Sequence, residues 1–477
     1  MKKFSFLLLL TGISLISFSQ TNYCGTQLTE ADLVWLRNFQ ASYTATAGDL
    51  RGGSIYFVPL KVHIVGTDEG GGYYNQTYLY TAICELNERF AETGFMFYIY
   101  GDIDYIAETD FYEHGWDDGS EMMQENNVND LVNIYFVSDP AGNCGYFSPG
   151  DDGVAIAKSC AMPGGTTISH ELGHFFSLPH TFYGWEWGTP DDEDQEWVDG
   201  DNCNSAGDGF CDTPPDYLNY RWNCPGPLQT DPHGDTFLSD GSLYMSYSND
   251  DCTSRFSDEQ MDAMVGNLVG PRNDLLDYPD PVYIDVTETP VLIEPADDAV
   301  EVAPNYTVFS WTAAAGAEKY HLQICYSPAF SAVAQDIVTE DTFSIVSGLQ
   351  LDKQYYWRVK PLAPLNTCET YTLGFSFRTS TFMSLTDQND LLGSFAISPN
   401  PVQSGQLLNI HYQNDVSFDA TLQLFDMTGK EILANQFNAV SGYGSFSVQL
   451  PVLSEGVYVM TISDGQRTET NKILITN

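Results

Sequence analysis

Apolar positions in the first half of the chain alternate between two periods. The runs SIYFVPLKVHIV, FMFYIYGDI and LVNIYFVS, from Ser54 onward, are short and rich in β-branched and aromatic residues, as is typical of strands. Tyr78 to Thr93 shows the three-to-four spacing of an amphipathic helix. Another short apolar run covers residues 153–158, and a helix is expected from about Thr167. This alternation predicts an α/β layer built on a twisted sheet.

The pattern is less regular after that helix. A loop-rich stretch predicts a smaller lower half, which ends in the helix-like segment FSDEQMDAMVGNLVG. We expect Ser257 to be the N-cap of this closing helix, because Gln260 stands three residues later as in a capping box. The two halves would leave a cleft between them.

Short strand-like runs separated by turns dominate the rest of the chain. A linker with several prolines is expected at residues 276–290. Residues 291–380 contain FSWT, YHLQICYS, FSIVSGL, YYWRVKPL and LGFSFRT, which predict a seven-strand β-sandwich. A polar linker at 381–391 leads to a second all-β segment at 392–477. The predicted fold class is therefore multidomain, with an α/β domain at residues 53–275 followed by two all-β sandwich domains.

The N-terminus predicts export. The segment MKKFSFLLLLTGISLISFSQ has a basic start, an apolar centre and small residues at Ser17 and Ser19, so we expect a signal peptide at residues 1–19. Residues 20–52 are too short and polar for a domain, and they predict a pro-segment or an N-terminal brace. No later segment offers the roughly 18 uninterrupted apolar residues of a membrane-spanning helix. We therefore expect an exported chain without a membrane span.

The charge balance is strongly acidic. Acidic residues outnumber basic ones 65 to 18, and the formal net charge is −47. Such a charge disfavours nucleic acid and anionic membrane surfaces as partners and favours cations. The stretch from Trp185 to Asp216 is rich in Asp and Glu and has no Lys or Arg. It would repel itself unless it is solvated or neutralised by calcium, and the composition leaves both alternatives open.

Cysteine usage agrees with export. The chain has 10 cysteines, and in an exported protein this number favours disulfides over reduced thiols. Short loops and domain boundaries favour four pairs: Cys144 with Cys160, Cys203 with Cys211, Cys224 with Cys252, and Cys325 with Cys368. Cys24 and Cys84 remain, and one hypothesis is that they pair with each other.

Candidate chemistry is concentrated in the stretch HELGHFFSLPH. His170 and His174 are four residues apart, so on a helix their imidazoles share one face and can bind one zinc ion. Glu171 is turned about 100° round the helix, near a zinc-bound water but not as a ligand. Zinc lowers the pKa of such a water towards about 7. We therefore predict that Glu171 is the general base in the hydrolysis of a peptide bond.

His180 is the expected third zinc ligand. It lies six residues past His174, so the helix must end and the chain must turn before it. Pro179 would break a continuing helix. The arrangement resembles the metzincin pattern H-E-x-x-H-x-x-G-x-x-H, with Ser177 where glycine is usual. Either the backbone turns there without a positive φ, or Ser177 is strained.

A wider resemblance extends from roughly Val58 to Leu268. The run HELGHFFSLPHTF, followed by GDGFCDTPPD and then YMSYSNDDC, resembles the pappalysin family of metzincins, including its shorter bacterial cytophagalysin-like members. It implies a secreted zinc-dependent endopeptidase that acts on extracellular proteins or peptides. It also implies that Met245 is the Met-turn residue beneath the metal, and that Tyr247 approaches the zinc or donates to an oxyanion.

The same resemblance adds three expectations outside the zinc triad. Family members hold a structural calcium beside the segment G-D-x-x-x-D-T-P, and the matching residues here are Asp208, Asp212 and Thr213. A cysteine of the pro-segment blocks the zinc in other metzincins, so Cys24 in NYCGTQ is a candidate latency switch, the alternative to its pairing with Cys84. Asp250 and Asp251 follow the Met-turn and would attract basic substrate side chains.

The two β segments also resemble known modules. Residues 291–380 resemble a fibronectin type III module, with Trp311 in the core and Tyr355 with Trp357 on a tyrosine-corner strand. The landmarks ISPNP, LFDMTGKEI and LSEGVYVMTI resemble the C-terminal sorting domain of type IX secretion cargo. This resemblance implies export across the outer membrane to the medium or the cell surface, with the type IX machinery as a partner. We expect a monomer.

A hypothesis of another class remains. A calcium-rich surface adhesin with an inactive protease-like domain would explain the acidic composition and the β-modules. The intact Glu171 argues against it, because a binding scaffold does not need a carboxylate at that position.

Overall fold

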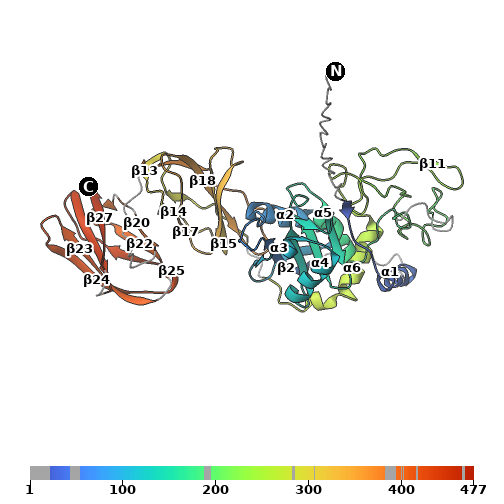
Figure 1. Ribbon diagram of the computed structural model, residues 1–477, viewed down its shortest axis with the longest axis horizontal. Helices are drawn as coiled ribbons and strands as arrows, with labels where there is room; N and C mark the ends of the chain where they lie inside the picture. Colours follow the sequence, from blue (N-terminus) through green and yellow to red (C-terminus); the bar gives the residue numbers. More distant parts are fainter. Residues whose placement is uncertain are drawn as a thin grey trace, which may run out of the picture. The chain divides into compact units, whose positions relative to one another are not determined.

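The computed structural model describes residues 22–42, 54–186, 195–281, 285–305, 307–381, 394–398, 400, 402–414, 417–464 and 468–476. The predicted signal peptide and residues 382–391 of the predicted linker at 381–391 lie outside the described residues. The chain divides into two compact units, Met1–Pro281 and Val282–Asn477, whose elements are labelled in Figure 1.

A seven-stranded sheet forms the centre of the first unit. Its strand order is β1-β8-β9-β6-β2-β3, and β4 also pairs with β2. Neighbours run parallel, except that β8 is antiparallel to β9. The inner strands are buried on both faces, which explains their continuous apolar runs. The bounds are β1 (Asn22–Cys24), β2 (Tyr56–Gly66), β3 (Phe95–Ile99), β4 (Asp104–Ala107), β6 (Val132–Val137), β8 (Asn143–Ser148) and β9 (Gly153–Ala157).

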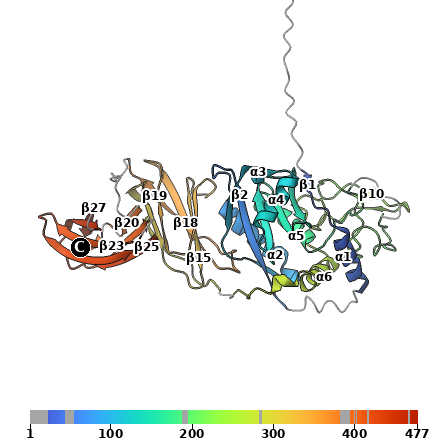
Figure 2. The ribbon, with the colours of Figure 1, turned by 60° about the horizontal axis from the view of Figure 1, so that its bottom comes forward.

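Helices pack around this sheet. The helix α5 bears the HELGH sequence, and β1 lies beside it (Figure 2). The helix α6 begins with the expected capping box, since Ser257 accepts from the backbone of Gln260 and the Gln260 side chain bonds back. Phe39 of α1 packs against Gly266 of α6. The helices are α1 (Glu30–Ser42), α2 (Gln76–Arg89), α3 (Thr109–Tyr112), α4 (Trp116–Asn126), α5 (Thr167–Phe175) and α6 (Asp258–Val269), with 3-10 turns at Ala91–Thr93 and Asn273–Leu276.

The stretch between α5 and α6 has little regular structure. Within its described part the only strands are the short pair β10 (Gln229–Thr230) and β11 (Thr236–Phe237). A second short pair, β5 (Glu113–His114) with β7 (Asp139–Pro140), lies beside the main sheet. Disulfides link the irregular parts, and they are three of the pairs expected from the sequence: Cys144–Cys160, Cys203–Cys211 and Cys224–Cys252.

The second unit contains two β-sandwiches. In the first, a three-stranded sheet, β12-β14-β17, and a five-stranded sheet, β13-β19-β18-β15-β16, share one apolar core around Trp311, Tyr355 and Trp357. The Tyr355 hydroxyl accepts from the backbone N–H of Gln350, as in a tyrosine corner. The bounds are β12 (Leu292–Glu294), β13 (Ala299–Val302), β14 (Thr307–Trp311), β15 (Lys319–Cys325), β16 (Val333–Thr339), β17 (Phe343–Val346), β18 (Gln354–Leu362) and β19 (Phe375–Thr379).

The second sandwich has sheets β20-β22-β25 and β21-β27-β26-β23-β24 around a separate core. Its inward positions alternate with outward ones along the strands. The bounds are β20 (Ser394–Ser398), β21 (Val402–Gln403), β22 (Leu407–Asn414), β23 (Phe418–Asp426), β24 (Glu431–Ala439), β25 (Gly442–Gln449), β26 (Gly456–Ser463) and β27 (Thr468–Thr476). Among the described helices of the whole chain, none is long and apolar enough to span a membrane.

The expected pairing of Cys325 with Cys368 is wrong. Cys325 is a buried free thiol at the end of β15. Cys368 follows Thr367, whose carbonyl oxygen accepts from Lys360, and Lys360 pairs with His321 on β15. Cys368 takes part in another disulfide, so Cys325 is left without a cysteine partner. Sequence spacing did not reveal this because the choice of partner depends on tertiary contacts.

Candidate metal centre

The zinc-site residues lie on α5 and on the turn that follows it. All residues of α5 are buried, and the helix ends at Phe175 with Phe176 as its C-cap. Ser177 has φ = 72°, so of the two alternatives the backbone does adopt the left-handed conformation that favours glycine. The Ser177 hydroxyl accepts a hydrogen bond from the Asn267 side chain at 2.6 Å. This bond from α6 offsets part of the conformational cost and lets serine replace glycine.

The three histidines converge through their Nε2 atoms. Nε2 of His174 lies 3.2 Å from Nε2 of His170 and 3.1 Å from Nε2 of His180. In a tetrahedral zinc site with Zn–N bonds of about 2.0–2.1 Å, the nitrogens are roughly 3.3 Å apart. The spacing of the triad therefore matches that of zinc ligands.

The opposite ring nitrogens determine the protonation state of the triad. Nδ1 of His170 donates to the carbonyl oxygen of Tyr244, and Nδ1 of His174 donates to that of Leu178, both at 2.7 Å. Nδ1 of His180 lies 3.4 Å from the Glu186 carboxylate. Burial and the neighbouring imidazoles hold the pKa of His170 and of His174 well below the usual range. His170 and His174 therefore keep free Nε2 lone pairs, and Nε2 of His180 faces the same buried space, an arrangement that favours a shared cation.

Met245 lies beneath this centre. It is fully buried, and its sulfur packs so closely on Gly173 that a side chain there would collide with it. The backbone of the same turn holds the site, because Tyr244 accepts from His170 and Met245 accepts from Thr181. The glycine in HELGH is thus needed for the approach of the turn that contains Met245.

Glu171 lies beside the triad and faces the N-terminal strand. Its Oε2 accepts from Thr26 Oγ1 at 2.7 Å and from Cys24 Sγ at 3.4 Å. Its Oε1 is buried without a hydrogen-bond partner among the described residues. Burial raises the pKa of Glu171 to about 8, although the bonds from Thr26 and Cys24 act in the opposite direction. The side chain is therefore placed to exchange a proton near neutral pH.

Cys24 lies at the metal centre rather than in a disulfide. Its Sγ belongs to a cluster with His170, His174 and His180 in which all ligand atoms lie within 4.8 Å of one another. It is buried and free, so the hypothesis of a Cys24–Cys84 pair is wrong. The physical reason is the parallel pairing of β1 with β8, which brings the N-terminal segment beside the triad.

Tyr247 completes the wall of the cleft. Its hydroxyl donates to the carbonyl oxygen of Cys24 at 3.3 Å, and its ring lies 5.0 Å from that of His180. Burial raises the pKa of Tyr247, so the phenol stays protonated and remains a donor. Tyr247 is therefore already bonded to a peptide carbonyl next to the triad.

A second buried polar cluster lies in the irregular stretch. Asp208 and Glu196 each have one carboxylate oxygen that is buried without a partner among the described residues. Burial raises the pKa of both carboxyls, and nearby acids add to the effect. Thr213 donates to Asp208 at 2.9 Å, whereas the expected ligand Asp212 is exposed and accepts from the backbone of Glu259 at 2.9 Å. Sequence reasoning missed Glu196, although it lies in the acidic run.

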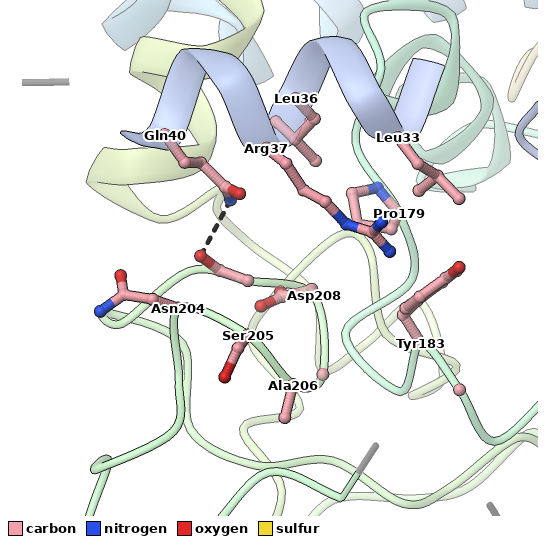
Figure 3. A pocket seen from close by; sticks show the side chains of 13 residues that line it. Leu33, Leu36, Arg37, Gln40, Pro179, Tyr183, Asn204, Ser205, Ala206 and Asp208 are labelled. Atoms are coloured by element: carbon pink, nitrogen blue, oxygen red, sulfur yellow. Dashed lines mark hydrogen bonds between the residues drawn. The ribbon is translucent and has the colours of Figure 1, made fainter. Parts of the chain in front are cut away.

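A cavity of about 450 Å³ separates α1 from the loop that contains Asp208. In Figure 3 Arg37 and Gln40 extend from α1 towards that loop, whereas Leu33 lies near Pro179 and Tyr183, and Gln40 donates to the carbonyl oxygen of Gly209 at 2.9 Å. The N-terminal segment therefore contacts both clusters, β1 at the triad and α1 at the acidic loop.

Comparisons with known proteins match two parts of the chain. Residues 153–269 match the family described as pregnancy-associated plasma protein-A. Residues 396–476 match the secretion system C-terminal sorting domain, which is consistent with the sequence landmarks noted above.

Individual relatives agree with the first match. An extracellular metalloprotease of Colletotrichum graminicola is 28% identical over 252 residues, covering 46% of this chain and 79% of the relative. One of Podospora anserina is 30% identical over 239 residues, covering 43% and 70%. Among solved structures, a promirolysin mutant of Tannerella forsythia aligns over 54% of this chain and 97% of that chain, with 19% identity and a TM-score of 0.40.

The match includes the helix α5, the turn at Met245 and the closing helix α6. With the sorting domain at the C-terminal end, these findings indicate secretion or presentation at the cell surface. The chain is a secreted zinc metalloprotease and belongs to the pappalysin family of metzincins.

Proposed function

We propose that this chain is a latent endopeptidase in which His170, His174 and His180 hold zinc, Glu171 is the general base and Cys24 blocks the metal. The convergence of three Nε2 atoms and one thiol in a single buried cluster supports this assignment most directly. Protein or peptide chains are the substrates. The adhesin hypothesis is not favoured, because Glu171 is intact and aimed at the same space.

The substrate path is inferred from β1. This strand pairs with β8 at Cys24 and Gly145, and without it β8 is the edge of the sheet. An edge strand presents unpaired N–H and C=O groups, to which an extended peptide can add as a further strand. A substrate would therefore lie along β8 and cross the metal centre where Cys24 now lies.

Two side chains of the cleft have assigned roles. Zinc bound by the triad would supply a Lewis acid that polarises the peptide carbonyl and increases the acidity of water. Glu171 Oε2 takes a proton from the attacking water as the new C–O bond forms, and it returns that proton to the amine nitrogen when the C–N bond breaks. The Tyr247 hydroxyl, which now donates to the Cys24 carbonyl oxygen, would donate to the substrate carbonyl oxygen as negative charge develops.

Latency follows from the same geometry. A thiolate is a good zinc ligand, and Cys24 Sγ lies in the cluster formed by the three imidazole nitrogens. Glu171 is at the same time engaged by Thr26 and Cys24, so both the metal position and the base are occupied. Release of β1 would free both.

The proposal is tested on the full chain with a denatured protein as substrate. Wild type, wild type with a zinc chelator, Glu171→Gln and Cys24→Ser are compared, with Cys325→Ser as the matched control for loss of a buried free thiol. We expect Cys24→Ser to be active without a lag and Cys325→Ser to behave as wild type. Glu171→Gln and the wild type with a zinc chelator should be inactive. Stoichiometric zinc with no cleavage in Cys24→Ser would overturn the proposal.

A calcium ion is assigned to the acidic cluster. The unpartnered oxygens of Asp208 and Glu196 support it, because two buried carboxylates need a cation or protons. Thr213 is close enough to bond Asp208, and Asp212 lies nearer the surface at the start of α6. Oxygen donors of this kind suit calcium, whereas the imidazole triad suits zinc.

The remaining assignments concern the modules. We propose domain limits of 53–275 for the protease, 291–380 for a fibronectin type III-like spacer and 392–477 for the sorting domain, after a signal peptide at 1–19. The sorting domain would be read by the type IX secretion machinery, and the chain would act as a monomer. Deleting residues 392–477 should retain the protein in the periplasm, as cell fractionation would reveal.

A further inference from the structure

Arg221 is a cation in the cleft that the mechanism above does not use. Its Nη2 lies 3.2 Å from the Asp250 carboxylate, and its Nη1 donates to the carbonyl oxygen of Ser248. Asp250 also accepts from Thr166 Oγ1 at 2.8 Å. The acid after the Met-turn therefore already has a cationic partner and a hydroxyl donor from its own chain.

Tyr23 lies against this ion pair. The Arg221 guanidinium stacks over the Tyr23 ring at 4.0 Å, and the Tyr23 hydroxyl lies 3.4 Å from Thr166 Oγ1. The same ring makes edge contacts with His170 at 5.0 Å and Tyr247 at 5.3 Å between centroids. Tyr23 is 5% exposed, so it fills a side-chain pocket next to the metal centre.

Tyr23 directly precedes Cys24, the residue at the metal. A side chain in this pocket would therefore belong to a residue close to the bond being cleaved, whichever way a substrate runs along β8. The pocket has an aromatic wall, a hydroxyl at its end and a planar cation over its face. This combination binds a phenyl or phenol ring through stacking and cation–π contact.

We propose that the Tyr23 pocket selects an aromatic residue beside the scissile bond, and that Arg221 determines this specificity. The inference rests on the proposed function, because it treats β1 as a stand-in for substrate. It replaces the expectation that Asp250 attracts basic side chains. A substrate Lys or Arg would meet the Arg221 guanidinium, and Asp250 is already paired with it.

The first test does not need catalysis. In the zinc-loaded full chain carrying Glu171→Gln, the rate at which a thiol reagent labels Cys24 reports how often β1 leaves the pocket. Mass spectrometry separates this site from Cys325, which serves as the internal reference because it is the other free cysteine among the described residues. In Tyr23→Phe the labelling rate of Cys24 should lie within about threefold of the parent rate, and in Tyr23→Arg it should be about tenfold faster than in the parent.

Adding Arg221→Met should reverse the order of the Cys24 labelling rates, so that Cys24 is labelled more slowly in the Tyr23→Arg chain than in the Tyr23→Phe chain. Arg255→Met is the matched control, since Arg255 forms a similar surface pair with Asp240 at 2.6 Å. It should leave the order unchanged. Equal protection by Tyr23→Arg and Tyr23→Phe, or an order that does not respond to Arg221→Met, would overturn the inference.

The second test maps cleavage sites in a denatured protein with the full chain carrying Cys24→Ala. We expect Phe, Tyr or Trp to be enriched at one position flanking the cut, and the preference to move towards Lys and Arg by about tenfold in Arg221→Met. Cleavage before or after basic residues in the Arg221 parent would refute the specificity but keep the protease. No cleavage with zinc bound would instead refute the proposed function, and the labelling result would still decide the pocket.

Discussion

The first unit contains two buried polar clusters that differ in how their residues are arranged along the chain. The histidine triad lies within one helix and its following turn, on a rigid element between the sheet and the turn at Met245. The acidic cluster of Glu196 and Asp208 lies in an irregular stretch held by the disulfide Cys203–Cys211. The acidic cluster leaves two carboxylate oxygens buried without partners among the described residues, and Glu171 beside the triad leaves one, yet only the triad was evident from local spacing.

The two clusters differ in whether their geometry is set by local backbone structure or by the path of a loop. A helix converts a spacing of four residues into a shared face, so sequence distance and spatial distance are linked. In an irregular loop sequence distance does not predict spatial distance, so the path of the loop determines which side chains meet. The chemistry of the two clusters also differs, since neutral imidazoles favour zinc and carboxylate oxygens favour calcium. The experiments below separate the two clusters by what each loses when it is changed.

The largest expected effect is on catalysis at the triad. Glu171→Gln should lower kcat by about 10²-fold or more, because the proton acceptor is removed while the metal ligands stay. Zinc content, measured on the same protein, should remain stoichiometric. Glu121→Gln on α4 is the matched control. Activity close to wild type in Glu171→Gln would show that the base is another group.

Calcium bound at the acidic cluster should raise the thermal stability of the protein. At a concentration of 100 times its Kd, an ion that binds only the folded state adds about 2.7 kcal/mol to the free energy of unfolding. Asp208→Asn should abolish this gain, and the exposed control Asp235→Asn should keep it. The measurement is the thermal midpoint with and without calcium, in zinc-loaded protein. An equal gain in Asp208→Asn would place the ion elsewhere.

Without calcium, the same cluster should make stability depend on pH. Burial raises the pKa of Asp208 to about 8, against about 3.9 for an ordinary aspartate, so the folded state holds more protons than the unfolded state between these values. The free energy of unfolding should therefore fall as pH rises from about 4 to about 8.

Chemical denaturation of the chelated protein at several pH values measures this slope. Glu196→Gln should reduce the slope, because it removes one of the two carboxyl groups whose pKa is raised by burial. Saturating calcium should reduce it in wild type, because the ion takes the place of the protons. A free energy of unfolding that rises with pH between about 4 and about 8 would contradict the assignment of these two acids.

The smallest effect is expected at the turn after α5. Ser177→Gly removes the strain of a positive φ, worth about 1 kcal/mol, and also the bond to Asn267, worth about 1 kcal/mol. The net change in stability should be below about 1 kcal/mol. Ser177→Ala keeps the strain and loses the bond, so it should be the less stable of the two, as denaturant unfolding can measure. The reverse order would mean that the positive φ at position 177 costs little, because both variants lose the hydrogen bond.

Local signals in the sequence were sufficient for several features. The capping box at Ser257, the triad positions and the strand runs of the sheet depend on neighbours within a few residues, and the structure contains them. Cys325 and Cys368 show the limit of this reasoning. They lie in one sandwich, but Cys325 is a free thiol and Cys368 takes part in another disulfide.

The surroundings of the site depend on contacts between segments that are distant in the chain. Cys24 reaches the triad only because β1 pairs with β8, more than a hundred residues later in the chain. Glu196 became a candidate only through its burial near Asp208. Arg221 pairs with Asp250, a contact that spacing in the sequence did not indicate.

The sequence by itself determined the metal chemistry, since the imidazole spacing is a property of one helix turn, and it determined the β character of the C-terminal half through its alternating positions. Only the tertiary structure decided which groups surround that chemistry: the thiol beside the triad, the tyrosine in the pocket and the arginine over it. The physical reason is that helical and strand periods act over a few residues, whereas the cleft is assembled from segments whose approach depends on packing and strand register.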